Sequence, residues 1–119
     1  MQRMLIVDDQ LDICGCLEDY FSARGFAVAS VFSGEQALQL LERQPADVVL
    51  LDILLPGLTG IEVLKRVRQI CPSAKVIMVT ALDQGELRAE ARRYGACAYV
   101  TKPFDFSETT WSAVFTAAH

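Results

Sequence analysis

The sequence lacks an excess of positive charge. Its 119 residues include 11 Lys and Arg against 15 Asp and Glu, which gives a formal net charge of -4 at pH 7. Proteins that hold nucleic-acid phosphates or anionic lipid headgroups use clustered Lys and Arg for that purpose. We therefore expect no direct binding of nucleic acid and no binding to a membrane by this chain.

Long hydrophobic runs are also absent. No apolar stretch approaches the ~18 residues needed to cross a membrane, and the short apolar run near the N-terminus ends at Asp8, too early for a secretory signal peptide. With 52% hydrophobic and 22% charged residues, the composition is that of a globular protein. We expect a single domain, covering residues 1–119, and a cytoplasmic location.

The four cysteines show no spacing typical of a disulfide framework. Two of them lie two positions apart on a predicted helix, so their side chains point to different sides and make a poor metal chelate. In a cytoplasmic protein the expected state is the reduced thiol. We interpret all four as buried or neutral thiols: Cys14, Cys16, Cys71 and Cys97.

Short apolar runs of strand length alternate with stretches of helical periodicity. The helical stretch at 84–95 has a thin apolar stripe, which predicts a loosely held helix. A last helix, predicted from Asp105 onward, would run out at His119, as expected for a piece of a longer protein. The predicted strands are residues 4–7, 26–31, 48–51, 76–79 and 98–101.

Capping signals support these helix boundaries. Residues 33–36 and 59–62 fit the capping box that closes the first turn of a helix. Gly25 and Gly95 stand where two helices should end and can adopt a left-handed cap. Five strands alternating with helices predict an α/β fold with a mostly parallel sheet covered on both faces.

Polar residues follow four of the predicted strands. Asp8 and Asp9 follow the first strand, Asp52 the third, Thr80 the fourth and Lys102 the fifth. In open parallel α/β sheets, ligands bind outside these carboxyl ends. The start of a polar loop would explain any one of these residues, but it explains the whole set less readily.

Three carboxylates with few soft ligands nearby suit a hard divalent cation such as Mg²⁺. A bound cation would stabilise the two adjacent aspartates, which otherwise repel each other. It would also let Asp52 approach an anionic phosphoryl group, with Lys102 as a second positive charge and Thr80 as a hydroxyl donor. The set therefore predicts phosphoryl transfer onto a carboxylate.

Four segments resemble, in order, the motifs of the receiver domain of two-component response regulators. They are VDD at 7–9, LLDILLPGLTG at 50–60, VTA at 79–81 and YVTKPF at 99–104. The resemblance covers essentially the whole chain. It implies a flavodoxin-like three-layer α/β/α fold, with five helices and a five-stranded parallel sheet in the order 2-1-3-4-5.

The resemblance also implies roles for the acidic residues and the lysine. Asp52 would be the phosphoacceptor, and Lys102 would contact the phosphoryl oxygens. Asp9 and Asp52 would coordinate Mg²⁺ directly, Asp8 largely through water, and the backbone carbonyl of Leu54 would complete the protein ligands.

Further roles are implied around the phosphoryl group. Thr80 and Tyr99 would form the switch pair, although an ordinary half-buried strand aromatic would explain Tyr99 equally well from its position alone. Ala81 and Pro103 would belong to the phosphoryl pocket. The peptide bond before Pro103 is commonly cis in such domains.

The resemblance implies a signalling phosphoacceptor and not an enzyme, beyond its own phosphoryl transfer and slow dephosphorylation. Because the only histidine, His119, is poorly placed as an internal donor, we expect the phosphohistidine of a histidine kinase or phosphotransfer protein, or a small acyl phosphate, to supply the phosphoryl group. The fourth helix, fifth strand and fifth helix would then shift to control an output domain or effector protein. The resemblance also allows a phosphorylation-dependent dimer.

Three other functions fit the sequence less well. Phosphatases of the haloacid dehalogenase type have an Asp-x-Asp motif after their first strand. DDQLD at 8–12 does not match that motif. A flavodoxin-like cofactor binder needs a Ser/Thr/Gly-rich phosphate loop where this chain has acidic residues. A phosphorylation-independent, receiver-like interaction module usually lacks one of the acidic or lysine positions, and none is missing here.

Overall fold

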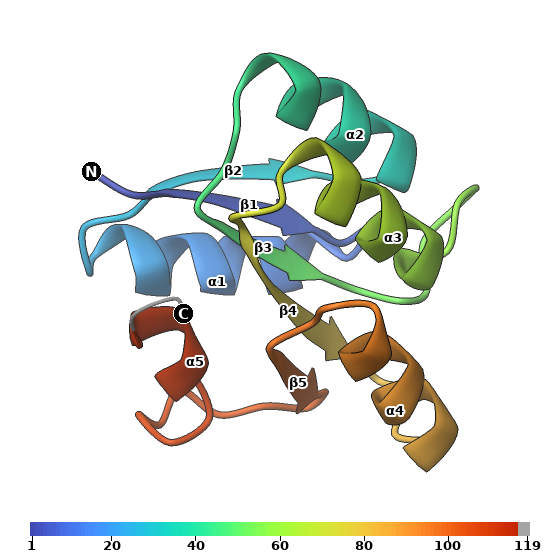
Figure 1. The fold of residues 1–119 in the computed structure, drawn as a ribbon. Helices are drawn as coiled ribbons and strands as arrows, with labels where there is room; N and C mark the ends of the chain where they lie inside the picture. The colour runs from blue at the N-terminus through green and yellow to red at the C-terminus, as the bar shows by residue number, and fades with distance from the viewer. Residues whose placement is uncertain (117–119) are drawn as a thin grey trace.

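The computed structural model describes residues 1–116, in which five strands form one parallel sheet (Figure 1). The strands are β1 (Arg3–Val7), β2 (Ala27–Val31), β3 (Val48–Leu51), β4 (Lys75–Thr80) and β5 (Ala98–Thr101). Their order is β2-β1-β3-β4-β5, and every neighbouring pair is parallel. The predicted sheet and its strand order are confirmed.

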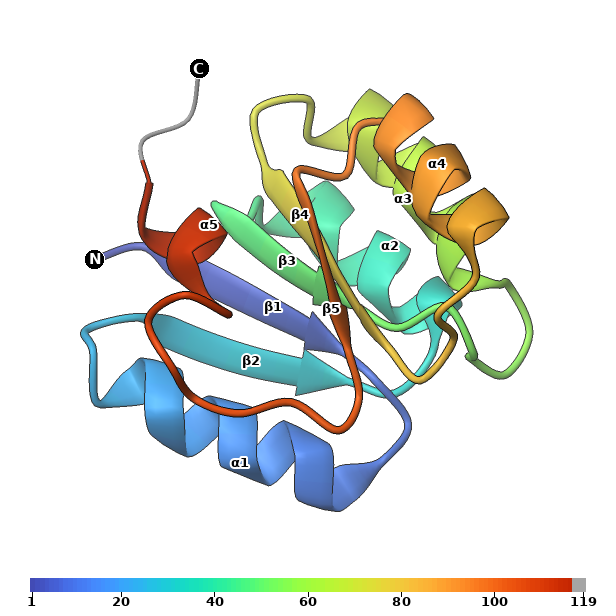
Figure 2. The same ribbon diagram turned by 90° about the horizontal axis from the view of Figure 1, so that it is seen from below.

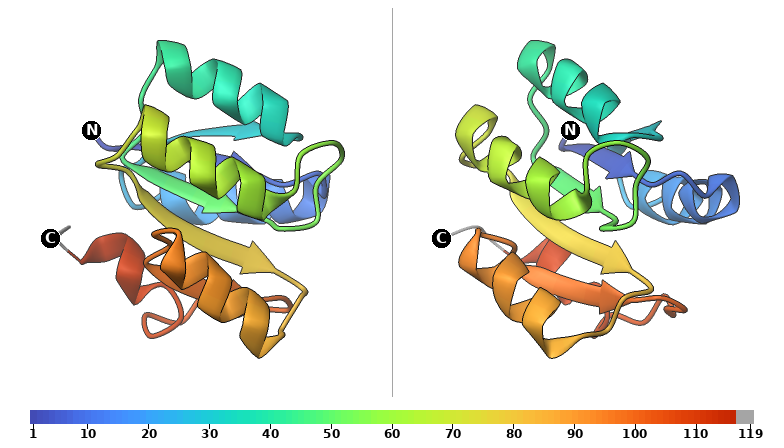
Figure 3. Two further views of the ribbon diagram at one scale, coloured as in Figure 1. Left: turned by 45° about the vertical axis from the view of Figure 1, so that its right-hand side comes forward. Right: turned by 90° about the vertical axis from the view of Figure 1, so that its right-hand side faces the viewer.

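Helices cover both faces of the sheet. In Figure 1, α2 lies above the sheet and α1 below it, and Figure 3 shows α4 next to β4 and β5. Side chains of α1 and α5 pack in one core, and side chains of α2, α3 and α4 pack in the other. The helices are α1 (Leu11–Ser22), α2 (Gly34–Arg43), α3 (Gly60–Ile70), α4 (Gly85–Arg93) and α5 (Ser112–Phe115).

Residues 4–7, 48–51 and 76–79 of the central strands are all apolar because both faces of these strands are buried. Along β1, Leu5 and Val7 join the core under α2 and α3, whereas Met4 and Ile6 join the core under α1. Successive side chains of a strand point to opposite faces, so a strand covered on both sides reads as a continuous apolar run. This sandwich fixes the carboxyl ends of β1, β3 and β4 in place.

The capping predictions hold in part. Thr59 and Glu62 form the full reciprocal capping box at the start of α3. At the start of α2 the Ser33 hydroxyl accepts from the backbone N–H of Gln36, but the Gln36 side chain accepts from the N–H of Phe32 instead of Ser33. Gly25 and Gly95 have φ values of 93° and 101°, which confirms the predicted left-handed caps.

The predictions for α4 and for the cysteines agree with the structure. Ala91 is the one buried residue of α4, which confirms its thin apolar stripe. All four cysteines lie in the described part of the chain and are free; Cys14 is buried and Cys16 exposed, so these two point to different sides as predicted. Among the described residues, no helix combines the length and the apolar character needed to cross a bilayer.

The prediction of a helix from Asp105 onward is wrong, because α5 begins only at Ser112. The carboxylate of Asp105 accepts from the backbone N–H of Ser107 and from the hydroxyl of Thr110, and the Ser107 hydroxyl accepts from the N–H of Thr110. Such local bonds between side chains and backbone compete with helical hydrogen bonding. The segment therefore forms turns, and α5 begins only after the buried Trp111.

Lys75 of β4 holds the end of this short helix. Its Nζ donates to the carbonyl oxygens of Ala113 and Val114, at 3.1 Å each, and also to that of Thr116. The last carbonyls of a helix have no partners within it, and a cation there is stabilised by the helix dipole. Lys75 therefore compensates for the small size of α5.

We expect Lys75→Met to lower the free energy of unfolding by about 1–2 kcal/mol, because methionine keeps part of the aliphatic stem but none of the donors. Urea denaturation measures this loss, and amide exchange should accelerate at Val114 and Thr116. Arg66→Met, on the exposed surface of α3, is the control and should change stability by less than about 0.5 kcal/mol. Equal losses in the two variants would contradict the role of Lys75.

Candidate functional site

The carboxyl ends of the strands meet at one edge of the sheet (Figure 2). Val7 of β1 pairs with Leu51 of β3, so Asp8 and Asp52 leave neighbouring central strands at the same level. The backbone N–H of Asp52 donates to the carbonyl of Val7 at 3.0 Å, which continues the sheet by one bond. The parallel register thus brings together two aspartates that are far apart in the sequence.

Lys102 joins these two aspartates. Its Nζ lies 2.7 Å from Asp8 Oδ2 and 2.8 Å from Asp52 Oδ2, and it donates to the side-chain carbonyl of Gln10 at 2.6 Å. Asp8 and Asp52 are 2% and 4% exposed, whereas Asp9 is exposed. The lysine therefore provides the positive charge that two buried carboxylates require.

Burial and pairing act in opposite directions on these charges. Burial raises the pKa of Asp8 above its ordinary value, although hydrogen bonds from Lys102 and from the N–H of Gln10 oppose the rise. Burial alone would lower the pKa of Lys102, but its hydrogen bonds to Asp52 and Asp8 outweigh that effect and the pKa is raised. Lys102 is accordingly held as an ammonium ion.

The acidic residues at this edge fit a divalent cation. Carboxylate oxygens of Asp8, Asp9 and Asp52 all lie within 4.8 Å of one another. Three carboxylates outnumber the single ammonium of Lys102, so negative charge remains in excess at the site. An all-oxygen donor set with excess negative charge is what Mg²⁺ prefers.

Leu54 lies at the same edge. Its backbone N–H donates to Asp52 Oδ1 at 3.2 Å, and its side chain is exposed. The N–H bond orients the Asp52 carboxylate. The use of the Leu54 carbonyl as a metal ligand stays a prediction.

Thr80 and Tyr99 are connected through the loop after β4. Thr80 is fully buried, and its hydroxyl accepts from the backbone N–H of Leu82 at 3.4 Å. The Tyr99 hydroxyl donates to the backbone carbonyl of Leu82 at 2.6 Å. The Arg88 guanidinium lies 4.6 Å from the centre of the Tyr99 ring. Burial raises the pKa of Tyr99. Thr80 and Tyr99 are therefore both hydrogen-bonded to the backbone of Leu82.

The two predicted pocket residues border the same edge. Ala81 follows Thr80 and is exposed, and Pro103 follows Lys102 and is exposed. The peptide bond between Lys102 and Pro103 is cis, as the resemblance implied. The backbone N–H of Lys102 donates to the carbonyl of Thr80 at 2.8 Å, which ties the ends of β4 and β5 together.

One residue at this edge was not anticipated from the sequence. Gln10 contacts both Lys102 and Asp8, although its residue type does not indicate a role at the site. Its place directly after Asp9 was the only available signal, since any residue there starts the loop above the carboxyl end of β1.

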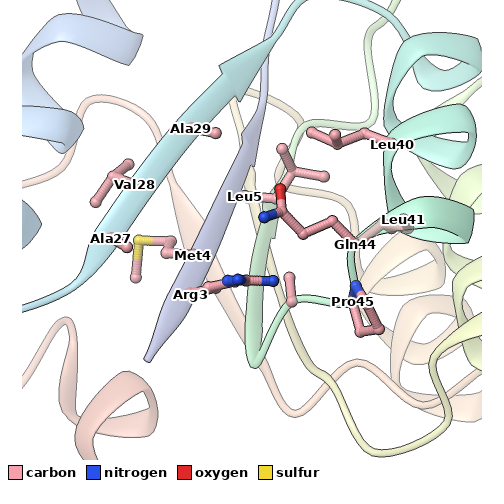
Figure 4. A pocket seen from close by; sticks show the side chains of 11 residues that line it. Arg3, Met4, Leu5, Ala27, Val28, Ala29, Leu40, Leu41, Gln44 and Pro45 are labelled. Carbon is pink, nitrogen blue, oxygen red and sulfur yellow. The ribbon is translucent and has the colours of Figure 1, made fainter. Parts of the chain in front are cut away.

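A separate pocket lies away from these carboxylates. It has a volume of about 140 Å³ and lies between α2 and the amino-terminal parts of β1 and β2 (Figure 4). Arg3 and Gln44 are polar, but the rest of the lining is largely apolar. It therefore lies at the opposite end of β1 from Asp8 and brings no carboxylates together.

Residues 4–112 match the family model described as the response regulator receiver domain. This chain belongs to that family. The sequence resemblance is thereby confirmed, and the chain is a receiver domain of two-component signal transduction. The haloacid dehalogenase and receiver-like alternatives are not favoured. The extent of the domain over residues 1–119 stays a prediction.

The chain covers very different shares of two of the curated proteins that it matches. The receiver domain is 37% identical over 107 residues to sporulation initiation phosphotransferase F of Bacillus subtilis, covering 90% of this chain and 86% of that protein. It is 40% identical over 108 residues to the regulatory protein AtoC of Escherichia coli, covering 91% of this chain but 23% of that protein. The chain therefore spans about a quarter of the latter relative.

A solved structure shows the same receiver fold. The CheY-like response regulator receiver domain protein from Methanospirillum hungatei superimposes with a TM-score of 0.85 at 30% identity. The match covers 88% of this chain and 84% of that one.

Proposed function

We propose that Asp52 of this receiver domain accepts a phosphoryl group from the phosphohistidine of a histidine kinase or phosphotransfer protein. The observation that carries the proposal is the shared contact of Asp52 and Asp8 with Lys102 beside Asp9. A carboxylate oxygen of Asp52 forms the new bond to phosphorus as the bond to the donor's imidazole nitrogen breaks. The imidazole leaves and takes up a proton from solvent.

The remaining groups offset negative charge during this transfer. Asp8, Asp9, Asp52 and the backbone carbonyl of Leu54 would hold Mg²⁺, which when bound neutralises charge between the carboxylate and the phosphoryl oxygens. Lys102 supplies a second positive charge. Thr80 donates its hydroxyl to a phosphoryl oxygen, and the small side chain of Ala81 together with Pro103 leaves room for the group.

Phosphorylation would then switch the surface of α4, β5 and α5. A hydrogen bond to a charged group contributes about 1.5–3 kcal/mol, whereas shifting a two-state equilibrium from 1:99 to 99:1 needs about 5.5 kcal/mol. Thr80 alone is insufficient, so Lys102 and the cation must contribute. Movement of Thr80 would break its hydrogen bond with the N–H of Leu82, and Leu82 is also the residue whose carbonyl accepts from the Tyr99 hydroxyl. The loop that contains Leu82 leads into α4, which has a single buried residue. An output domain or effector protein would read this change.

Intact-mass measurement after incubation with acetyl phosphate tests the proposal. In the presence of Mg²⁺ the wild type should gain the mass of one phosphoryl group, and after metal removal with a chelator it should gain none. Asp52→Asn should gain none in either condition, because the amide is a poor nucleophile. Asp19→Asn, an exposed change on α1, is the control and should behave as wild type. Phosphorylation of Asp52→Asn, or none of the wild type, would overturn the proposal.

A further inference from the structure

Lys102 uses all of its donors in this structure. An ammonium group has three N–H bonds, and the Nζ of Lys102 has three acceptors, on Asp8, Asp52 and Gln10. A phosphoryl oxygen arriving at Asp52 would need a donor from this same ammonium. One of the three existing bonds must therefore be given up.

The three acceptors differ in what their release would cost. Until the bond to phosphorus forms, Asp8 and Asp52 are both carboxylates with side chains that are 3% and 5% exposed, so loss of the ammonium at that stage would leave one buried carboxylate poorly paired. Gln10 is neutral and exposed, and its carbonyl oxygen can bond to water instead. Gln10 is the acceptor that can be exchanged most easily.

The backbone of Gln10 is fixed separately from its side chain. Its N–H donates to Asp8 Oδ1 at 2.9 Å, and its carbonyl accepts from the N–H of Cys14 at 3.1 Å. The side chain makes no capping bond to α1. Substitution at this position therefore removes the contact with Lys102 and leaves these backbone bonds in place.

We propose that Gln10 is a positioning residue that restrains Lys102 in the unphosphorylated domain and is released when Lys102 turns to the phosphoryl group. The bond exists before transfer and is lost during it, so it slows phosphorylation at Asp52. After transfer Lys102 is already held by the phosphoryl oxygens, so Gln10 has no effect on hydrolysis. This inference rests on the proposed phosphorylation of Asp52.

Rates of phosphorylation by acetyl phosphate with Mg²⁺, and of hydrolysis after the donor is removed, test the inference. Gln10→Met keeps the length of the side chain without the acceptor, and Gln10→Asn keeps the amide on a shorter side chain. Both should be phosphorylated roughly threefold to tenfold faster than wild type, with hydrolysis unchanged within about twofold. Gln39→Met, an exposed change on α2, is the control and should leave both rates unchanged.

The results separate this inference from the proposed function. A wild type that takes up no phosphoryl group contradicts the proposed function itself. A wild type that is phosphorylated, with Gln10 variants that are equally fast or slower, overturns the restraint by Gln10. Parallel changes in phosphorylation and hydrolysis also overturn it, because damage to the site would move both rates together.

Discussion

Replacement of Lys102 by methionine is expected to lower the free energy of unfolding by about 3 kcal/mol when no divalent cation is present. The ammonium is the shared partner of Asp8 and Asp52, both of which are almost fully buried. Methionine would leave two buried carboxylates facing each other without a positive charge. Urea denaturation with a chelator in the buffer measures the loss, and phosphorylation by acetyl phosphate should fall by at least about 100-fold.

Two further measurements attribute this loss to charge and not to packing. Adding Asp52→Asn to Lys102→Met removes one of the unpaired carboxylates, so the double variant should be less destabilised than the sum of the single changes. Mg²⁺ should stabilise Lys102→Met more than wild type, because the cation then faces three carboxylates without a competing ammonium. If Lys102→Met unfolds at the same urea concentration as wild type, the ammonium does not stabilise the buried pair.

The strands show how far an apolar pattern predicts a fold. β3 and β5 have the predicted bounds. β4 is longer by one residue at each end, and both additions, Lys75 and Thr80, have polar side chains. Their backbones pair with the neighbouring strands, so hydrogen bonding and not side-chain polarity decides where β4 ends.

The site was predictable where it depends on topology alone. Parallel strands end at one edge, so Asp8 and Asp52 leave the adjacent strands β1 and β3 side by side, and the long side chain of Lys102 reaches both of them from the end of β5. The contact of Gln10 with Lys102 depends on side-chain reach across a loop, which a linear pattern does not encode. The turn that delays α5 depends in the same way on local bonds made by Asp105.

Gly60 supports the site through the path of the backbone, although in the sequence it stands only as the last residue of the LLDILLPGLTG segment, next to a predicted helix cap. It is the first residue of α3, and its N–H donates to the carbonyl of Ile53 at 2.9 Å. A Cβ added there would lie 2.6 Å from Ile53 Cα and 2.7 Å from the carbonyl carbon of Asp52, closer than real Cβ atoms approach. The start of α3 is thus packed directly against the backbone of the proposed phosphoacceptor.

We expect Gly60→Ala to lower the free energy of unfolding by about 3 kcal/mol, because the clash is with backbone that cannot rotate away. Gly15→Ala is the matched control: it lies within α1 with no atom inside 4 Å of the added Cβ, so it should stabilise the domain by about 0.5–1 kcal/mol through its higher helix propensity. Urea denaturation compares the two. Because α3 relieves the clash only by moving Asp52 or itself, folded Gly60→Ala should also be phosphorylated more slowly than Gly15→Ala. Similar stability and similar phosphorylation of the two variants would show that the approach of α3 does not position Asp52.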